Sequence, residues 1–296
     1  VGNDPLSQID PLGLVLAAFD GTNNDAERDK WGTKENAPSN VAIMADLYRG
    51  KVLYKWGVGT RSDIILGNLS GKGLDERVED NLKLLKEYLK QNPDEPVDII
   101  GFSRGAASAR IFANRVKKEI PCATIRFLGI FDTVAQIGPP NRFNYQYGFD
   151  LNVDRRSIGF IAHAVAKDEH RSLFPLTSIS GSYSPIFPGI MQTYRPDEIR
   201  NISGRNYWEQ PFDGVHSDIG GGYQDTRNVE ALRWMIERGQ GAGAPFKNLE
   251  GYKYYKKLEQ LNSPLDHDSR YPFIDRLPWT HWGRGQRVVY PGNDQN

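Results

Sequence analysis

The sequence predicts an α/β fold built on a doubly wound, mostly parallel sheet. Short apolar runs that are typical of buried strands alternate along the chain with longer segments whose apolar residues recur on one helical face. Two of these apolar runs end in an aspartate, at the point where a parallel strand would open at the edge of its sheet. A chain of 296 residues can bury the core of one large domain of this kind.

The expected elements follow from these patterns in chain order. Positions 74, 78, 82, 85 and 89 are apolar and share one face, which predicts a long helix that ends before Pro93. A serine cap predicts an earlier helix that begins near Ser39. The full set is a strand over 14–19, a helix over 39–48, a strand over 52–54, a helix over 74–89, a strand over 97–100, a helix over 106–116, a strand over 125–131 and a helical stretch over 158–166.

The most specific signal is the sequence Gly-Phe-Ser-Arg-Gly at 101–105, between a predicted strand and a predicted helix. A Cβ at either glycine would clash in so tight a turn, and the serine hydroxyl then projects at the top of the sheet. The helix that begins beneath it offers backbone N–H groups to a developing oxyanion. This context predicts an α/β-hydrolase type of fold with Ser103 as nucleophile. The alternative is a glycine-rich turn whose serine only caps the helix.

A nucleophilic serine requires a base and a carboxylate that orients the base. Asp132 ends the next predicted strand and is the candidate acid, unless it only bonds its own backbone in a turn. His216 is the candidate base, because a polar, glycine-rich stretch over 212–223 is typical of a loop shaped around a site. His163 is the alternative base, although a histidine in an apolar stretch more often has a structural role. The remaining histidines rank lower: His170 as a solvated helix end, and His267 and His281 in a polar tail.

The turn after the first strand is a candidate oxyanion hole. In this fold class a loop after an early strand supplies one oxyanion N–H, and the residue after the nucleophile supplies the other. The donors would then be Arg104 and either Gly21 or Thr22, with Asp20 positioning the loop. Two alternatives remain open: an Asx turn, and a metal site, because the side chains of residues 20, 24 and 25 carry hard oxygen ligands.

Five motifs in a fixed order carry a resemblance to a known family. They are Phe-Asp-Gly-Thr at 19–22, Trp-Gly-Val-Gly-Thr at 56–60, the turn at 101–105, Phe-Asp-Thr-Val at 131–134 and the glycine-rich string at 214–223. The stretch from about 15 to about 238 resembles the α/β-hydrolase family that includes the first class of type VI secretion lipase effectors, which attack membrane phospholipids. The resemblance implies Ser103 as nucleophile, Asp132 as acid and His216 as base, with Asp218 in support. The approach at 209–214 departs from the aromatic-Pro-Gly sequence that relatives tend to carry.

The first fourteen residues resemble the closing motif of Rhs repeat proteins, Asp-Pro-x-Gly-Leu, which here begins at Asp10. That resemblance implies a cut between Leu14 and Val15 that releases a toxin domain. Residues 1–14 would then end the Rhs shell, and 15–296 would form the toxin, with a catalytic core to about 238 and an extension over 239–296. The alternative is a Pro/Gly-rich linker.

Composition excludes several other classes of protein. With 37 basic and 37 acidic residues, the chain has no electrostatic footprint for nucleic acid. No apolar stretch is long enough to span a membrane, no signal peptide is expected, and one cysteine cannot build a zinc cluster. We therefore expect neither a metal nor a cofactor. An irregular, proline-rich apolar insertion over 173–194, between acid and base, is either a lid, a membrane-contact loop or an ordinary buried loop. The run 252–257 would either meet anionic headgroups or form a solvated helix face.

The serine turn and its candidate partners predict a serine carboxylic ester hydrolase, and the two resemblances imply a phospholipase of the A type that acts as an antibacterial secreted effector. The expected partners are the membrane phospholipid substrate, the Rhs shell, the type VI secretion spike and a cognate immunity protein. The expected destination is the periplasm of a target cell. The alternatives are a soluble esterase or thioesterase without a toxin role, and a non-catalytic binding module on a hydrolase scaffold.

Overall fold

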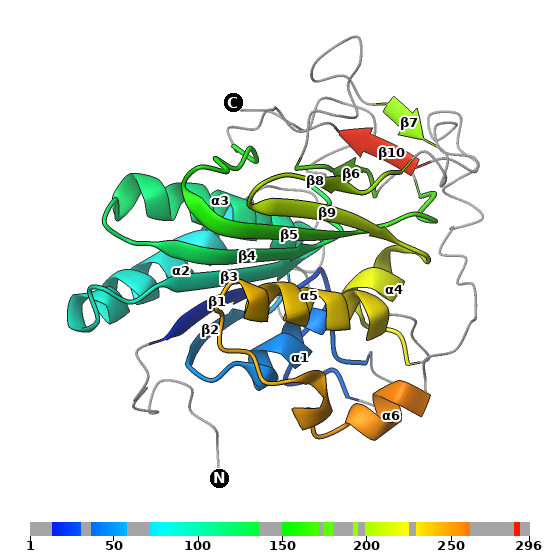
Figure 1. Ribbon diagram of the computed structural model, residues 1–296, viewed down its shortest axis with the longest axis horizontal. Helices are drawn as coiled ribbons and strands as arrows, with labels where there is room; N and C mark the ends of the chain where they lie inside the picture. The colour runs from blue at the N-terminus through cyan, green and yellow to red at the C-terminus, as the bar shows by residue number, and fades with distance from the viewer. Residues whose placement is uncertain are drawn as a thin grey trace.

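The computed structural model describes residues 14–30, 37–57, 72–135, 150–171, 174–179, 192–194, 199–224, 229–260 and 287–290, the backbone alone being described at 72–73, 192–194, 260 and 287–290. A seven-stranded sheet lies between two groups of helices (Figure 1). The elements are β1 (Val15–Phe19), α1 (Asn40–Leu47), β2 (Lys51–Lys55), α2 (Lys72–Gln91), β3 (Val97–Phe102), α3 (Arg104–Glu119), β4 (Ile125–Phe131), β5 (Ile158–Ala166), β6 (Leu176–Thr177), β7 (Gln192–Tyr194), β8 (Ile202–Ser203), β9 (Tyr207–Phe212), α4 (His216–Gly220), α5 (Val229–Gly241), a 3₁₀ turn (Leu249–Gly251), α6 (Tyr255–Gln260) and β10 (Arg287–Tyr290).

The strands of the large sheet follow the order β2-β1-β3-β4-β5-β9-β8. All neighbouring pairs are parallel except β8 and β9, which are antiparallel. A small second sheet has the order β6-β10-β7. The predicted α/β class with a doubly wound, mostly parallel sheet is therefore confirmed.

The direction in which successive strands are added to the sheet reverses at β1. The chain leaves β1 to form β2 on one side and then returns through α2 to form β3 on the other side. Two connections that leave in opposite directions open a crevice between the carboxyl ends of β1 and β3, which is where open α/β sheets bind ligands. The residues that follow these two strands are Asp20 and Ser103.

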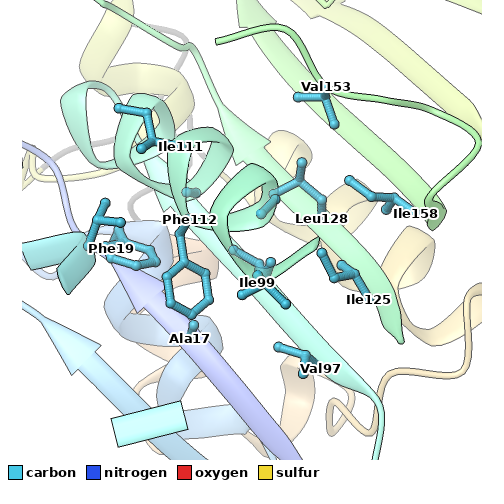
Figure 2. Packing of buried hydrophobic residues seen from close by; sticks show 14 of the residues in the cluster. Ala17, Phe19, Val97, Ile99, Ile111, Phe112, Ile125, Leu128, Val153 and Ile158 are labelled. Carbon is cyan, nitrogen blue, oxygen red and sulfur yellow. The ribbon is translucent and has the colours of Figure 1, made fainter. Parts of the chain in front are cut away.

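Helices cover both faces of the sheet, and alternate strand residues enter opposite cores. Val15, Ala17 and Phe19 belong to the cluster that α2 and α3 cover, whereas Leu16 and Ala18 belong to the cluster beneath α1 and α5. In the first cluster the ring of Phe112 on α3 lies against Phe19, with 5.2 Å between ring centroids (Figure 2). Because both faces are packed, the strands read as continuous apolar runs.

The helix predicted over 158–166 is wrong, because these residues form β5. Every residue from Ile161 to Ala166 is buried, so no polar alternation marks the strand in the sequence. The other predicted elements up to residue 131 are present with boundaries shifted by a few residues.

The sequence also makes predictions for the cleavage motif, for the insertion over 173–194 and for the run 252–257. The proposed cleavage motif lies outside the described residues except for Leu14, whose carbonyl accepts a hydrogen bond from Lys51 N at 2.7 Å. Most of the insertion over 173–194 lies outside them as well, although β6 and β7 are described near its ends. In the run 252–257, Tyr252 is buried in the core and Tyr254 is exposed. Within the part of the chain that the structure describes, no helix is long and apolar enough to cross a membrane.

The packing of α2 predicts how much stability is lost when a side chain is truncated in the core that α2 and α3 cover. Leu82 is fully buried against the sheet, and its neighbour Lys83 is exposed. We expect Leu82→Ala to lower the free energy of unfolding by about 2–5 kcal/mol, because a large side chain is lost from a packed interior. The matched variant Lys83→Ala should change it by no more than about 0.5 kcal/mol. Urea denaturation measures both, and equal effects would contradict this packing.

Candidate active site

The turn between β3 and α3 holds Ser103 in a strained backbone conformation. Its φ is 58° and its ψ is −123°, a region that residues with a side chain rarely adopt. The two flanking glycines make the turn possible. A Cβ on Gly101 would lie 2.5 Å from the carbonyl oxygen of Gly105, and a Cβ on Gly105 would lie 2.2 Å from that of Phe19. Residues 101–105 therefore form the tight strand–turn–helix elbow that is predicted from the sequence.

Three side chains form a continuous chain of hydrogen bonds at this turn. His216 Nε2 lies 2.8 Å from Ser103 Oγ, and His216 Nδ1 lies 2.6 Å from Asp132 Oδ2. An ionised carboxylate can only accept, so Nδ1 carries the proton and Nε2 is left to accept from the serine hydroxyl. All three side chains are buried, with Ser103 4% exposed. The structure thus brings together the three residues that the sequence singles out.

Asp132 is fixed by the neighbouring strand β5. Its backbone N–H donates to Ala164 O at 2.7 Å, and its Oδ1 accepts from Ala166 N at 2.9 Å. Its φ of 36° is again unusual for a residue with a side chain. These contacts leave Oδ2 directed at His216.

His216 opens α4 and is not part of a loop, contrary to the expectation for 212–223. Its ring contacts two aromatic rings, with its centroid 4.7 Å from that of Phe102 and 5.0 Å from that of Phe174. Burial lowers the pKa of His216 below its ordinary value, although the Asp132 carboxylate opposes this shift. A histidine held neutral in this way is available to accept a proton.

Glu169 and Arg171 support the histidine, and neither is predicted from the sequence. Glu169 Oε2 accepts from the backbone N–H of His216 at 3.2 Å, and both carboxylate oxygens accept from the Arg171 guanidinium. That guanidinium stacks over Phe174 at 3.5 Å from the ring centroid. Because Glu169 lies in a charged run after a strand, the sequence alone gives it the signature of a solvated residue.

The short helix α4 is capped by its own sequence. Asp218 Oδ2 accepts from Val215 N at 3.0 Å, so the carboxylate closes the first turn of the helix that carries His216. Gly214 has a φ of 114°, and a Cβ there would lie 2.7 Å from Asp218 Cβ. Asp218 thus caps the helix that carries His216, and its supporting role in the site stays a prediction.

The loop after β1 is held by Asp20. Its Oδ1 accepts from Gly21 N at 2.7 Å, and its Oδ2 accepts from Ser39 Oγ at 2.8 Å and from the Tyr54 hydroxyl. Burial raises the pKa of Asp20 to about 6, although these hydrogen bonds oppose the shift. Since Gly21 N–H is already bonded to Asp20, Thr22 becomes the better candidate for an oxyanion donor. The buried hydroxyl of Thr22 finds no hydrogen-bond partner within the described residues.

The metal alternative at this loop finds no support in the geometry. Asn24 Nδ2 and Asp25 N both donate to Asp29, while Asp20 is directed at Ser39 and Tyr54. Across the described ranges, no group of three or more His, Cys, Asp or Glu side chains could hold a metal ion.

Of the other histidines, the structure describes His163 and His170. His163 is fully buried on β5 and contacts Glu209 and Thr133. His170 is half-buried in an irregular segment and is not the helix end that the sequence suggests. His267 and His281 lie outside the described residues.

A mostly parallel sheet whose strained serine turn meets a histidine and an aspartate is the arrangement of an α/β-hydrolase type of fold. The chain belongs to the family described as the type VI secretion system (T6SS) phospholipase effector Tle1-like catalytic domain, whose sequence model matches residues 14–120 and 113–238.

Two solved structures are similar to the chain. An uncharacterized protein from Pseudomonas aeruginosa is similar in fold, with 22% sequence identity and a TM-score of 0.61 over 84% of this chain and 48% of that one. The Tle1 effector, solved bound to the VgrG spike of the type 6 secretion system, has 22% identity and a TM-score of 0.47 over 71% of this chain and 51% of that one. The chain therefore spans about half the length of each. No curated protein matches the sequence.

The buried Asp20 carboxylate predicts a pH dependence of stability. Its folded pKa of about 6 exceeds the ordinary value of 3.8, so the stability it contributes is complete below about pH 4 and is lost as pH rises through about 6. Relative to Asp20→Asn, which cannot ionise, the wild type should lose up to about 3 kcal/mol across this window, at about 1.4 kcal/mol per pKa unit. Urea denaturation of both proteins at several pH values measures the difference, and a constant difference would contradict it.

Proposed function

We propose that this chain is a serine hydrolase that cleaves carboxylic ester bonds of membrane phospholipids. The observation that carries the proposal is the hydrogen-bonded chain from Ser103 through His216 to Asp132 at the end of β3. Membership of a phospholipase effector family supports the substrate class. A phospholipase of the A type, which releases a fatty acid, is the activity most consistent with a serine nucleophile.

In this mechanism Ser103 Oγ attacks the ester carbonyl while His216 Nε2 takes the hydroxyl proton. The imidazolium that forms is stabilised by Asp132, and it then protonates the leaving alcohol, the lysophospholipid. Water hydrolyses the acyl-enzyme with the same base, releasing the fatty acid and restoring Ser103. The lowered pKa of His216 supports this role, because the free enzyme then holds a neutral base at neutral pH.

The oxyanion would be stabilised from two sides of the crevice. Arg104 is the first residue of α3, where a backbone N–H faces outward from the helix start. Across the crevice, the turn at 20–22 packs tightly on the elbow: a Cβ on Gly21 would lie 2.4 Å from the Phe102 ring. We assign the second donor to Thr22, through its N–H and, given its buried hydroxyl, through Oγ1.

The biological setting is part of the proposal. We infer an antibacterial effector that is delivered by the type VI secretion system to the periplasm of a target cell and is neutralised in its producer by an immunity protein. A spike partner and an Rhs shell, with release between Leu14 and Val15, remain predictions from the sequence resemblance.

Replacing the nucleophile tests the proposed chemistry. Ser103→Ala should lower kcat for ester hydrolysis by about 10⁴- to 10⁶-fold, because the covalent step is lost, while the free energy of unfolding changes by only about 1 kcal/mol. Fatty-acid release from phospholipid vesicles and labelling by a serine-directed phosphonate measure the effect. A folded Ser103→Ala protein that keeps a tenth of the activity would contradict the assignment.

The dependence of hydrolysis on substrate aggregation separates a phospholipase from a soluble esterase. We expect hydrolysis of a short-chain phospholipid to rise sharply above the concentration at which it forms micelles. An enzyme that hydrolyses soluble esters equally well, and shows no gain at the interface, would overturn the lipid substrate but leave the serine mechanism standing.

The pKa of the base sets the pH profile. His216 must be neutral to accept a proton, so activity should be present above its folded pKa and be lost below it. Because burial lowers that pKa from the ordinary 6.5, the acid limb of kcat/KM should have its midpoint below pH 6.5. A pH–rate series with a soluble ester measures this midpoint. A midpoint above 6.5 would mean that another group limits the reaction.

A further inference from the structure

A second histidine–carboxylate pair lies behind the acid. His163 on β5 and Glu209 on β9 are direct partners in the parallel register, and both side chains are fully buried. His163 Nδ1 lies 2.8 Å from Glu209 Oε2. The mechanism proposed above does not use this pair, although burying two such groups is costly unless they are well bonded.

The partner of the other ring nitrogen fixes the tautomer of His163. Thr133 N lies 3.1 Å from His163 Nε2. A backbone N–H can only donate, so Nε2 must be the acceptor, and the ring proton is therefore on Nδ1, facing Glu209. Thr133 Oγ1 also lies 3.1 Å from Nε2. The ring thus joins the carboxylate to one particular peptide group.

Glu209 is itself held as a carboxylate. Besides His163, it accepts from Ile179 N at 2.8 Å and from Ser178 Oγ at 2.7 Å. Although burial raises its pKa, these hydrogen bonds hold the pKa of Glu209 below its ordinary value. The carbonyl of Ser178 in turn accepts from the buried Arg110 guanidinium at 3.1 Å. Glu209 is therefore a rigid acceptor that orients the His163 ring.

The peptide that His163 binds is the one that follows the acid. Thr133 N–H belongs to the peptide plane after Asp132, so its direction sets the ψ angle of Asp132. The peptide plane before Asp132 is fixed by Ala164 O, and the side chain is fixed by Ala166 N. Strand β5 thus holds Asp132 at three points, of which only the contact from His163 is made by a side chain. Asp132 needs this support because its φ of 36° is strained.

We propose that His163, oriented by Glu209, is a positioning residue that holds Asp132 in the orientation that His216 requires. The proposal rests on the proposed function, because it assumes that Asp132 serves as the acid. It assigns to His163 an effect on turnover through the backbone of a neighbouring turn, without contact with substrate.

Two substitutions of similar size separate the two contacts of the ring. In His163→Gln the amide oxygen can take the place of Nε2 and accept from Thr133 N, while Glu209 loses a donor. In His163→Asn the amide nitrogen can take the place of Nδ1 and donate to Glu209, while Thr133 N loses its acceptor. A positioning role predicts that kcat for a soluble ester stays within a few-fold in His163→Gln. In His163→Asn it should fall about 100-fold at similar KM, as expected when a catalytic group is displaced by about 1 Å.

The reverse order would overturn the proposal, because it would show that satisfying Glu209 is what matters. Equal losses of kcat in the two variants, or failure of both to fold by urea denaturation, would also overturn it, since the pair would then serve the fold as a whole. If only His163→Gln folds, a kcat within a few-fold of the wild-type value supports the proposal, and a larger loss overturns it.

A measurement without turnover keeps this inference separate from the proposed function. The His216 Nδ1 proton bonded to Asp132 should give a strongly downfield proton resonance in the wild type and in Ser103→Ala. The signal should be retained in His163→Gln, and it should be shifted or lost in His163→Asn. Hydrolysis that survives in Ser103→Ala would defeat the proposed function alone. An unchanged signal in His163→Asn would defeat the positioning role alone.

Discussion

Parallel pairing of β1 with both β2 and β3 is the constraint on which the candidate site depends. The register places Phe19 opposite Gly101, so the turn that starts at Asp20 and the turn that carries Ser103 leave the sheet side by side. The two turns then pack so closely that Gly105 cannot carry a Cβ. The same alignment continues through β4 and β5, which brings Asp132 and the groups that hold it to one edge. The surroundings of the serine turn are therefore set by the register of the sheet.

Buried charge at this edge is always shared among several donors. Asp20, Glu169 and Glu209 each accept at least three hydrogen bonds from residues distant in the sequence or adjacent in a turn. An unpaired buried carboxylate would cost several kcal/mol or would take up a proton. The bonds therefore do more than stabilise each group, because they also hold neighbouring backbone: Asp20 holds Gly21, and Glu169 holds His216.

Much of the fold is predictable from the sequence because its first half obeys local rules. The elbow at 101–105 combines a strand, two sterically required glycines and a helix, and the structure has all three. Strand β5 is not predictable in the same way. Both of its faces are buried from Ile161 to Ala166, so its apolar, alanine-containing run shows no period of two, and the strand extends over nine residues, a length that also suits a helix.

The three candidate catalytic residues can be predicted from the sequence, whereas the residues that hold them in place cannot. Ser103, Asp132 and His216 each follow or interrupt an apolar run, and the structure brings them within hydrogen-bond distance, although their catalytic roles stay predictions. Glu169 and Tyr54 leave no comparable trace. Each is placed by long-range packing that a local pattern of charges or aromatics cannot express.

The separation of the three groups along the chain has a consequence for folding. The hydrogen bonds from His216 to Ser103 and to Asp132 close loops of 113 and 84 residues. Contacts of such long range form late, because the entropy of loop closure opposes them until the sheet is complete. In a partly folded chain the His216–Ser103 and His216–Asp132 hydrogen bonds are therefore absent, and their appearance during refolding would report a late step of assembly.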